Sequence, residues 1–439
     1  MPTGTERKKS RVLSGMRPTG RLHIGHYFGA LQNWVRLQDD PAYECFYFIA
    51  DWHALTSDYA DTSAVAENTL QIMIDYLAAG LDPAKSVIFQ QSAVPEHAEL
   101  HLLLSMVTPL GWLERVPTYK EALENVKDKD LHNYGFLGYP ILQCADIVIY
   151  SNPGVQLFVP VGEDQVSHVE LSREIVRKFN ADFGGINLDP SIMDRQNTKH
   201  VTELWSVLSS ELKHFAGLLG LAGIPIYPTR IEALELGSST LARQIGYDNF
   251  LDKIGESRNF IRPKILIVQE PAAMLTKTPR IPGLDGRKMS KSYGNTITLS
   301  ESDADIRAKT KVMVTDPARK RRTDPGNPDI CPVYDWHKLF SAEEPGRLEW
   351  VQTGCRTAGI GCIECKAAMA ENLIKWIAPV RERRVKYEKN PKQVLELLDA
   401  GSKRARAVAQ GTMARVRESV FGWEKKRAEI DGTAGSAKA

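Results

Sequence analysis

Mostly apolar runs alternate with amphipathic stretches along the first part of the chain. Residues 11–15 (RVLSG), 45–50 (CFYFIA) and 155–161 (VQLFVPV) are typical of strands buried inside a parallel sheet. Residues 26–37 and about 62–79 instead repeat apolar side chains every three or four positions, as helices with one buried face do. Strands and helices that alternate in this way favour a parallel α/β sheet.

The remainder of the chain is predicted to be mainly helical. Residues 96–115 and 137–150 have helical patterns. Residues 184–262 are less regular, but they contain one amphipathic helix at 204–219 and a second one at about 239–254. From 363 to 427 the chain is helical and basic.

Composition excludes several classes of protein. With 439 residues, 43% hydrophobic and 25% charged, the chain is too apolar for a disordered polymer and too long for a small disulfide scaffold. No stretch reaches the roughly 20 apolar residues that span a bilayer, and the basic N-terminus lacks the apolar core of a secretory signal. We therefore expect a cytoplasmic protein with no membrane partner.

The charge is unevenly distributed, although the formal net charge is only +2. Residues 301–439 carry 27 Lys and Arg against 20 Asp and Glu, whereas the rest of the chain is acidic overall. The C-terminal third is therefore the better candidate for contact with a polyanion.

The first candidate for chemistry is Pro18-Thr19-Gly20 followed by His23-Ile24-Gly25-His26, between a predicted strand and a predicted helix. A helix N-terminus presents unpaired N–H groups that favour phosphate, and imidazoles can donate to phosphate oxygens. The alternative is an ordinary strand-to-helix turn that contains glycine and surface histidines.

The second candidate is the loop Lys288-Met289-Ser290-Lys291-Ser292. Two ammonium groups three residues apart can neutralise the charge that builds on a leaving pyrophosphate. The alternative is a solvated basic loop. After this loop, Ser300 and Asp303 are expected to cap the next helix.

Together these motifs resemble the paired HIGH and KMSKS signatures of class I aminoacyl-tRNA synthetases. The segments SGMRPTGRLHIGHYFGAL, FYFIADWHALT, GYPILQCADIVIY, VPVGEDQ and GRKMSKSYGN resemble successive motifs of the tryptophanyl-tRNA synthetases, over residues 11–180 and about 264–425. The family implies an α/β fold: a Rossmann-like parallel-sheet catalytic domain and a C-terminal α-helical anticodon-binding domain.

The resemblance also implies the activity and the partners. The expected reaction joins L-tryptophan to ATP, with Mg²⁺, to give tryptophanyl-adenylate and pyrophosphate, and then transfers tryptophan to tRNA(Trp). The family further implies a homodimer with residues 96–125 as a contact region, and no DNA partner. Two alternatives are another nucleotidyl-transferring enzyme with an HxGH turn, and a paralogue that binds tryptophan and ATP in a redox or regulatory role without charging tRNA.

Site residues follow from the resemblance, position by position. The catalytic set is Lys288, Lys291, His26 and Thr19. The ATP site adds residues from three motifs: Arg17, Pro18, Gly25, Gly162, Glu163, Asp164, Ile281, Met289, Ser290 and Ser292. The tryptophan pocket is expected to contain Asp146, Gln143, His53, Gln165 and Leu13.

Asp146 and Leu13 also have a physical reason for their roles. An indole has one hydrogen-bond donor and no acceptor, so a buried carboxylate such as Asp146 selects it. The related tyrosyl enzymes have a tyrosine and an aspartate where this chain has Leu13 and Arg17. A phenol hydroxyl profits from a second polar partner, which Leu13 does not offer, and tryptophan is therefore the expected substrate.

Four cysteines form a third constellation: Cys331, Cys355, Cys362 and Cys365. Four thiolates in one polar segment suit zinc or an iron–sulfur cluster, and the spacing does not separate the two. A subgroup of the tryptophanyl family has nearly this pattern and holds a [4Fe–4S] cluster near the anticodon-binding region. The resemblance therefore favours a [4Fe–4S] cluster, with zinc as the alternative.

Residues 181–262 have no counterpart that the resemblance can place. The expected order is a flexible basic N-terminus (1–10), a catalytic domain in two pieces (11–180 and 263–298) interrupted by a mainly helical insertion (181–262), a helical anticodon-binding domain with the cysteines (299–428), and a disordered tail (429–439).

Overall fold

The computed structural model describes residues 8–117, 119–121, 131–224, 230–275 and 281–431. The chain forms two compact units. Unit 1 holds the chain up to Leu13, Val94–Met274 and the part from Ala405 onward, and unit 2 holds Ser14–Ala93 and Leu275–Arg404. These units divide the chain differently from the expected domain boundaries, which remain a prediction.

A five-stranded sheet has the order β3-β2-β1-β4-β7. Arg11 lies opposite Leu157 in one parallel pair, and Phe46 lies opposite Val87 in another. The predicted parallel α/β sheet followed by a helical C-terminal region is therefore confirmed. Its strands are β1 (Ser10–Met16), β2 (Tyr43–Ile49), β3 (Val87–Gln90), β4 (Leu157–Val161) and β7 (Pro271–Leu275).

In the first part of unit 2, helices follow each strand. The helix predicted at 26–37 is present but irregular, because a five-residue π-helical segment, η1 (Tyr27–Leu31), separates two α-helical pieces. The next long helix ends as expected at Gly80, whose φ of 113° suits glycine. The helices are α1 (Ile24–His26), α2 (Gln32–Gln38), α3 (Asp51–Asp58), α4 (Val65–Ala79) and the 3₁₀ turn η2 (Gln91–Ala93).

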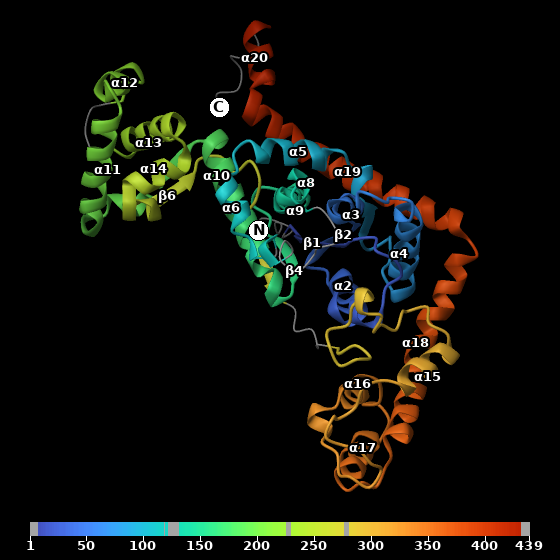
Figure 1. Ribbon diagram of the computed structural model, residues 1–439. Coiled ribbons are helices and arrows are strands. Elements are labelled where there is room, and N and C mark those ends of the chain that lie inside the picture. The colour runs from blue at the N-terminus through green and yellow to red at the C-terminus, as the bar shows by residue number, and fades with distance from the viewer. Residues whose placement is uncertain (1–7, 118, 122–130, 225–229, 276–280, 432–439) are drawn as a thin grey trace, which may run out of the picture. The chain divides into compact units, whose positions relative to one another are not determined.

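The regular elements in the second part of unit 2 are helices, separated by loops. The capping residue predicted at Ser300 is wrong: Ser302 caps the helix, and its Oγ accepts from the Asp305 N–H at 3.1 Å. In Figure 1, α18 is the long helix against which α15 and α16 pack. The elements are η7 (Lys291–Tyr293), α15 (Asp303–Lys311), η8 (Pro328–Ile330), α16 (Pro332–Phe340), α17 (Arg347–Arg356), α18 (Cys362–Glu388) and the start of α19 (Pro391–Phe421).

In unit 1, α9 packs against both α5 and α10. The single helix predicted at 96–115 is broken before Pro109, because a proline cannot continue the hydrogen-bond ladder of the preceding helix. The helices are α5 (Glu96–Ser105), α6 (Leu110–Glu114), α8 (Tyr134–Leu137), α9 (Tyr139–Val148), η3 (Glu163–Gln165), α10 (Val166–Gly184) and α20 (Trp423–Ile430). The tail expected from residue 429 thus begins inside α20.

The residues expected to be an insertion form a helical lobe of unit 1 with a core of its own (Figure 1). Each of the two predicted helices is divided, one at His214 in the left-handed region and the other at Gly246. The lobe contains β5 (Ile186–Leu188) antiparallel to β6 (Ile261–Pro263), the helices α11 (Thr198–Glu211), α12 (Phe215–Leu221), α13 (Ile231–Ile245) and α14 (Tyr247–Ile254), and the turns η4 (Pro190–Met193), η5 (Arg195–Asn197) and η6 (Gly255–Phe260).

No helix in the described ranges has the length and apolarity that crossing a bilayer requires.

Helix α19 approaches the edge of the sheet very closely in unit 2. A Cβ added to Gly401 would lie 1.8 Å from the backbone oxygen of Ile88 in β3. One residue further, the Ser402 hydroxyl accepts from the Gln90 N–H at 3.2 Å, which satisfies a backbone donor at the sheet edge. Gly401 is therefore required by the contact between helix and strand rather than by its own dihedral angles.

We predict that Gly401→Ala destabilises the protein by about 1–3 kcal/mol, because α19 must move away from β3. Gly411 is the matched control: it lies in the same helix, and a Cβ there would meet nothing within 4 Å. Gly411→Ala should stabilise the helix by about 0.5–1 kcal/mol. Urea unfolding followed by circular dichroism measures both changes, and equal shifts would contradict the close-contact explanation.

Candidate active site

Backbone hydrogen bonds bring the two sequence motifs together within unit 2. The Ile24 N–H donates to the Ile297 oxygen at 3.0 Å, and the Leu299 N–H donates to the Leu22 oxygen at 2.8 Å. The turn that precedes this pairing is tight, with the Thr19 N–H donating to the Arg17 oxygen at 2.9 Å. The HIGH turn is thus attached to the chain that directly follows KMSKS.

The rings of the two histidines of this turn lie close together, with centroids 3.6 Å apart and planes tilted by 33°. Burial, helped by the Lys291 charge, lowers the pKa of His23 to about 4. Burial, helped by the charges of His23 and Lys291, lowers the pKa of His26 to about 2. Both rings are therefore neutral at pH 7. The His23 N–H donates to Nδ1 of His26 at 3.2 Å, which places the His26 proton on Nε2. His26 can thus offer a neutral N–H donor to a phosphate oxygen.

Lys291 of the KMSKS loop reaches the HIGH turn directly. Its Nζ donates to the backbone oxygens of Thr19 at 3.1 Å and Gly20 at 2.7 Å. Burial lowers the pKa of Lys291 to about 8, and the Asp75 carboxylate raises it in part. Lys288, by contrast, is exposed.

Asn295 holds the KMSKS loop in shape from within. Its side chain is buried, and its Oδ1 accepts from the Ser290 N–H at 2.8 Å. Its Nδ2 donates to the Lys288 oxygen at 3.1 Å and to the Asp285 carboxylate at 2.7 Å. Beside it, the Ser290 and Ser292 hydroxyls lie 2.9 Å apart.

Gly25 is confined by both motifs. A Cβ added there would lie 2.9 Å from Nδ1 of His23 and 3.4 Å from the sulfur of Met289, which is itself buried. Ile281, at the start of the loop segment, and Pro18 are buried as well. The motif residues therefore form one packed site in unit 2.

A buried ion pair underlies the HIGH turn. The Asp75 carboxylate accepts from the Leu22 N–H at 2.7 Å through Oδ2, and it pairs with the Arg384 guanidinium through Oδ1. Asp75 lies in α4 and Arg384 near the end of α18, and both side chains are almost fully buried. Burial raises the pKa of Asp75 to about 6, although Arg384 and the Leu22 N–H oppose this.

Unit 1 holds most of the residues expected to bind tryptophan. Asp146 is buried in α9, and its Oδ1 lies 2.5 Å from Nδ1 of His97. Leu13 is also buried, while Gln143 and Gln165 are half-buried. His53 belongs to unit 2, where its N–H donates weakly to Gln91 Oε1 at 3.4 Å.

The GED segment lies in unit 1 as well. Gly162 is extended and begins the 3₁₀ turn η3, in which Glu163 is exposed. The side chain of Asp164 lies outside what the structure describes. In unit 2, Arg17 and Thr19 are exposed at the HIGH turn.

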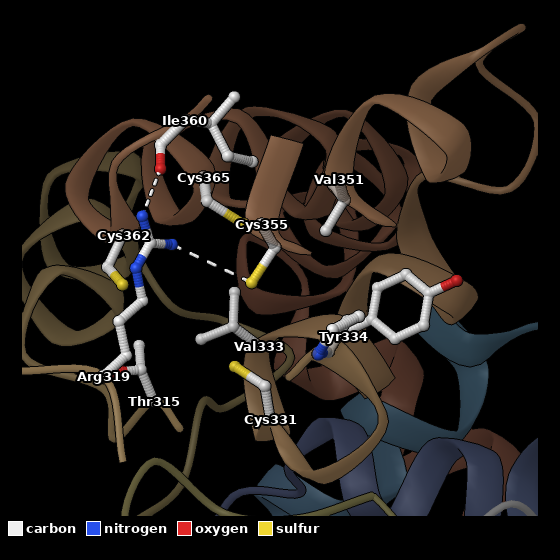
Figure 2. Close-up of a pocket in the computed structure, with 11 residues that line it drawn as sticks. Thr315, Arg319, Cys331, Val333, Tyr334, Val351, Cys355, Ile360, Cys362 and Cys365 are labelled. Carbon is white, nitrogen blue, oxygen red and sulfur yellow. Dashed lines mark hydrogen bonds between the residues drawn. The ribbon is translucent and has the colours of Figure 1, made fainter. Parts of the chain in front are cut away.

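The four cysteines line one pocket of unit 2. Figure 2 shows Cys331, Cys355, Cys362 and Cys365 around this pocket, with the Arg319 guanidinium between the sulfurs. Arg319 donates to the Cys355 sulfur at 3.8 Å and to the Ile360 oxygen at 2.6 Å. As the side chains stand, the described residues include no group of three or more His, Cys, Asp or Glu arranged to hold a metal ion.

Two buried polar residues of these sites escaped the sequence analysis: Asp75 and His97. Each lies in a helix, at a position where the apolar pattern either predicts a buried side chain or does not decide between a buried and an exposed one. A charged residue on the apolar face of a helix is a signal of a buried partner. Asp75, within the run IMIDYL, is the clearest example.

Comparison with known proteins identifies the family. Residues 5–197 and 238–378 match the family described as tRNA synthetases class I (W and Y). The tryptophan–tRNA ligase of Ralstonia nicotianae is 46% identical over 414 residues, which cover 93% of this chain and 98% of that protein. The tryptophan–tRNA ligase of Thermotoga maritima is 42% identical over 410 residues, with 93% and 98% covered.

A solved structure supports the same relationship. Tryptophanyl-tRNA synthetase from Campylobacter jejuni, complexed with ADP and tryptophan, superposes with a TM-score of 0.66 at 28% sequence identity. The match covers 93% of this chain and 99% of that one.

We predict that Arg384→Met destabilises the protein by about 3–5 kcal/mol at pH 8, because it leaves the Asp75 charge buried without its partner. In the wild type the folded pKa of about 6 exceeds the ordinary 3.8, so ionisation of Asp75 costs stability as pH rises through that window. Without Arg384 the folded pKa of Asp75 is higher still, so the pH range in which its ionisation costs stability extends upward. The destabilisation should therefore be smaller at pH 5 than at pH 8.

Arg383→Met is the control. Within the described part of the chain, Arg383 donates one hydrogen bond, to the Ala78 oxygen, and it does not pair with Asp75. Thermal unfolding at both pH values should show a small change for it that does not depend on pH. A loss for Arg384→Met that is the same at pH 5 and pH 8 would argue against an unpaired Asp75 charge.

Proposed function

The chain belongs to the class I aminoacyl-tRNA synthetases of the tryptophan and tyrosine family, and we propose how its residues perform that chemistry. It is a tryptophan–tRNA ligase, which activates L-tryptophan with ATP and transfers it to tRNA(Trp). The observation that carries this conclusion is the sequence identity of 46% and 42% with two tryptophan–tRNA ligases, each over 93% of this chain.

In the first step, a carboxylate oxygen of tryptophan attacks the α-phosphorus of ATP. The bond from phosphorus to the bridging oxygen breaks, and pyrophosphate leaves with the electron pair. Lys291 and Lys288 are proposed to stabilise this charge. The contact of Lys291 with two neutral carbonyls supports the role, because anionic phosphate oxygens are stronger acceptors and can replace them.

The HIGH turn is proposed to hold the phosphates mainly through neutral donors, with the Arg17 guanidinium as the charged group. His26 donates its Nε2–H, and Arg17, Thr19 and the backbone around Gly25 complete the cradle. Mg²⁺ bound with the ATP would supply further charge neutralisation. In the second step a ribose hydroxyl of the tRNA end attacks the adenylate carbonyl, and AMP leaves.

The remaining site residues are proposed to bind the other parts of the substrates. Gly162, Glu163 and Asp164 hold the ribose. Ser290, Ser292, Met289, Ile281 and Pro18 shape the ATP site. Asp146 accepts the indole N–H, and Leu13, Gln143, Gln165 and His53 line the tryptophan pocket. The burial of Leu13 and Asp146 supports this, because one apolar and one acceptor-only wall suit indole better than phenol.

The ligase is expected to catalyse tryptophan-dependent ATP–pyrophosphate exchange and charging of tRNA(Trp). Lys291→Ala should lower exchange by about two orders of magnitude or more, since it removes leaving-group stabilisation. For the wild type, kcat/KM for ATP should fall as pH rises above about 8, where Lys291 loses its proton. Lys291→Arg stays charged, so its profile should lack that fall.

Exchange supported by tyrosine but not by tryptophan would overturn the substrate assignment. Near-wild-type exchange in Lys291→Ala would refute the role of the lysine and leave the assignment intact.

The four cysteines are proposed to hold a [4Fe–4S] cluster, with zinc as the alternative. The pocket fits such a group because all four cysteines line it and the cation of Arg319 lies beside them. Arg319 is 9% exposed, and its described partners are the Cys355 sulfur and two backbone oxygens. Its Nε is buried without a partner. Four thiolates on a metal centre would give this guanidinium a negatively charged neighbour.

Protein purified without oxygen is expected to show the visible charge-transfer band of a cluster and to contain iron and sulfide in equal amounts. Cys362→Ser should lose both, whereas Cys45→Ala, in β2, should retain them. A colourless protein that contains zinc would contradict the cluster and support the alternative.

We also propose a homodimer and a tRNA-facing C-terminal region. Residues 96–125 are the proposed dimer contact, and the exposed side chains of Leu102, Met106 and Leu110 support this. Residues 299–428 are the proposed anticodon-binding region, which their excess of basic residues supports.

A further inference from the structure

A chain of three buried polar groups runs through unit 1 behind the proposed indole acceptor. Nδ1 of His97, in α5, lies 2.5 Å from Asp146 Oδ1. Nε2 of the same ring lies 2.7 Å from the Tyr150 hydroxyl. The side chains of His97 and Asp146 are 0% and 1% exposed, and Tyr150 is fully buried. Neither the family motifs nor the proposed mechanism assigns a role to His97.

The direction of each hydrogen bond follows from the chemistry of the groups. An ionised carboxylate only accepts, so the His97 proton must lie on Nδ1. With that single proton on the ring, Nε2 accepts from the Tyr150 hydroxyl, 2.7 Å away. Burial and the nearby carboxylates raise the pKa of Tyr150 well above its usual value, which keeps that hydroxyl protonated. Every proton in this chain therefore points toward Asp146.

The surrounding helices hold the chain of groups in place. The Arg11 guanidinium donates to the Tyr150 backbone oxygen at 2.7 Å. Next to His97 on α5, Glu96 is paired with Arg406 at 2.9 Å. Helices α5 and α9, which carry His97 and Asp146, pack directly against each other. The ring of His97 thus has one orientation available, and the carboxylate that it holds has little freedom to rotate.

We propose that His97 is a positioning residue that keeps Asp146 ionised, oriented and able only to accept a hydrogen bond. A substrate ring must then present an N–H to the Asp146 carboxylate. A ring without this donor leaves the buried carboxylate with one hydrogen bond fewer. His97 would therefore set the preference for tryptophan over isosteres without touching the substrate. This inference rests on the proposed role of Asp146.

The test compares tryptophan with 3-benzothienylalanine, in which sulfur replaces the indole N–H. The measured quantity is the ratio of kcat/KM for the two amino acids in ATP–pyrophosphate exchange. Two polar variants of similar size separate the roles of the ring nitrogens. In His97→Asn the amide N–H occupies the place of Nδ1 and still faces Asp146. In His97→Gln it occupies the place of Nε2 and faces Tyr150.

The ratio should fall by about tenfold or more in His97→Gln, and it should stay within about threefold of wild type in His97→Asn. KM for ATP should be unchanged in both. His101→Leu, one turn further along α5 with its ring 6.2 Å from that of Tyr134, is the control and should keep the wild-type ratio. Thermal unfolding verifies that each variant is folded.

Equal ratios in the Asn and Gln variants would overturn the proposal, because a purely structural role does not depend on which nitrogen position is retained. A wild-type enzyme without preference for tryptophan, or an unchanged preference in Asp146→Asn, would instead refute Asp146 as the indole acceptor. The two failures are therefore distinguishable.

Discussion

A short stretch of backbone pairing organises the active site. The hydrogen bonds of Leu22 and Ile24 with Leu299 and Ile297 join two parts of the chain that are far apart in sequence. The contact between Lys291 and Thr19 spans 272 residues. Closing such a long loop has a large entropic cost, which the surrounding packing must offset. Without this pairing the histidines and the lysines would be two unrelated surface motifs.

The pairing also explains why the groups of the site have unusual protonation. His23, His26 and Lys291 share a partly buried volume, so burial disfavours the charged form of each one. The histidines lose their charge well below neutral pH, whereas Lys291 remains mostly charged. The site therefore places the Lys291 cation beside neutral imidazole donors, an arrangement suited to a substrate whose charge increases on one leaving group.

Much of this could be predicted from sequence, because local patterns report local structure. The apolar runs predicted β1, β2 and β4 to within a few residues, and the two motifs predicted which residues meet. Partners could not be predicted. The apolar run around Asp75 signals that a partner exists, but a single sequence does not say which residue faces Asp75 or His97 across the fold. Ser302 rather than Ser300 caps α15 because the cap depends on where the preceding backbone is held.

Helix α18 has a mechanical consequence. Its first turn carries Cys362 and Cys365 of the cysteine pocket, and its last turns carry Arg384, which holds the base of the HIGH turn. At 1.5 Å per residue these points are about 33 Å apart on one continuous rod. A displacement of the cysteine end along the axis is transmitted to the other end almost undiminished. Pro379 lies between these two points and cannot donate a backbone hydrogen bond, so it is the place in the rod where bending costs least.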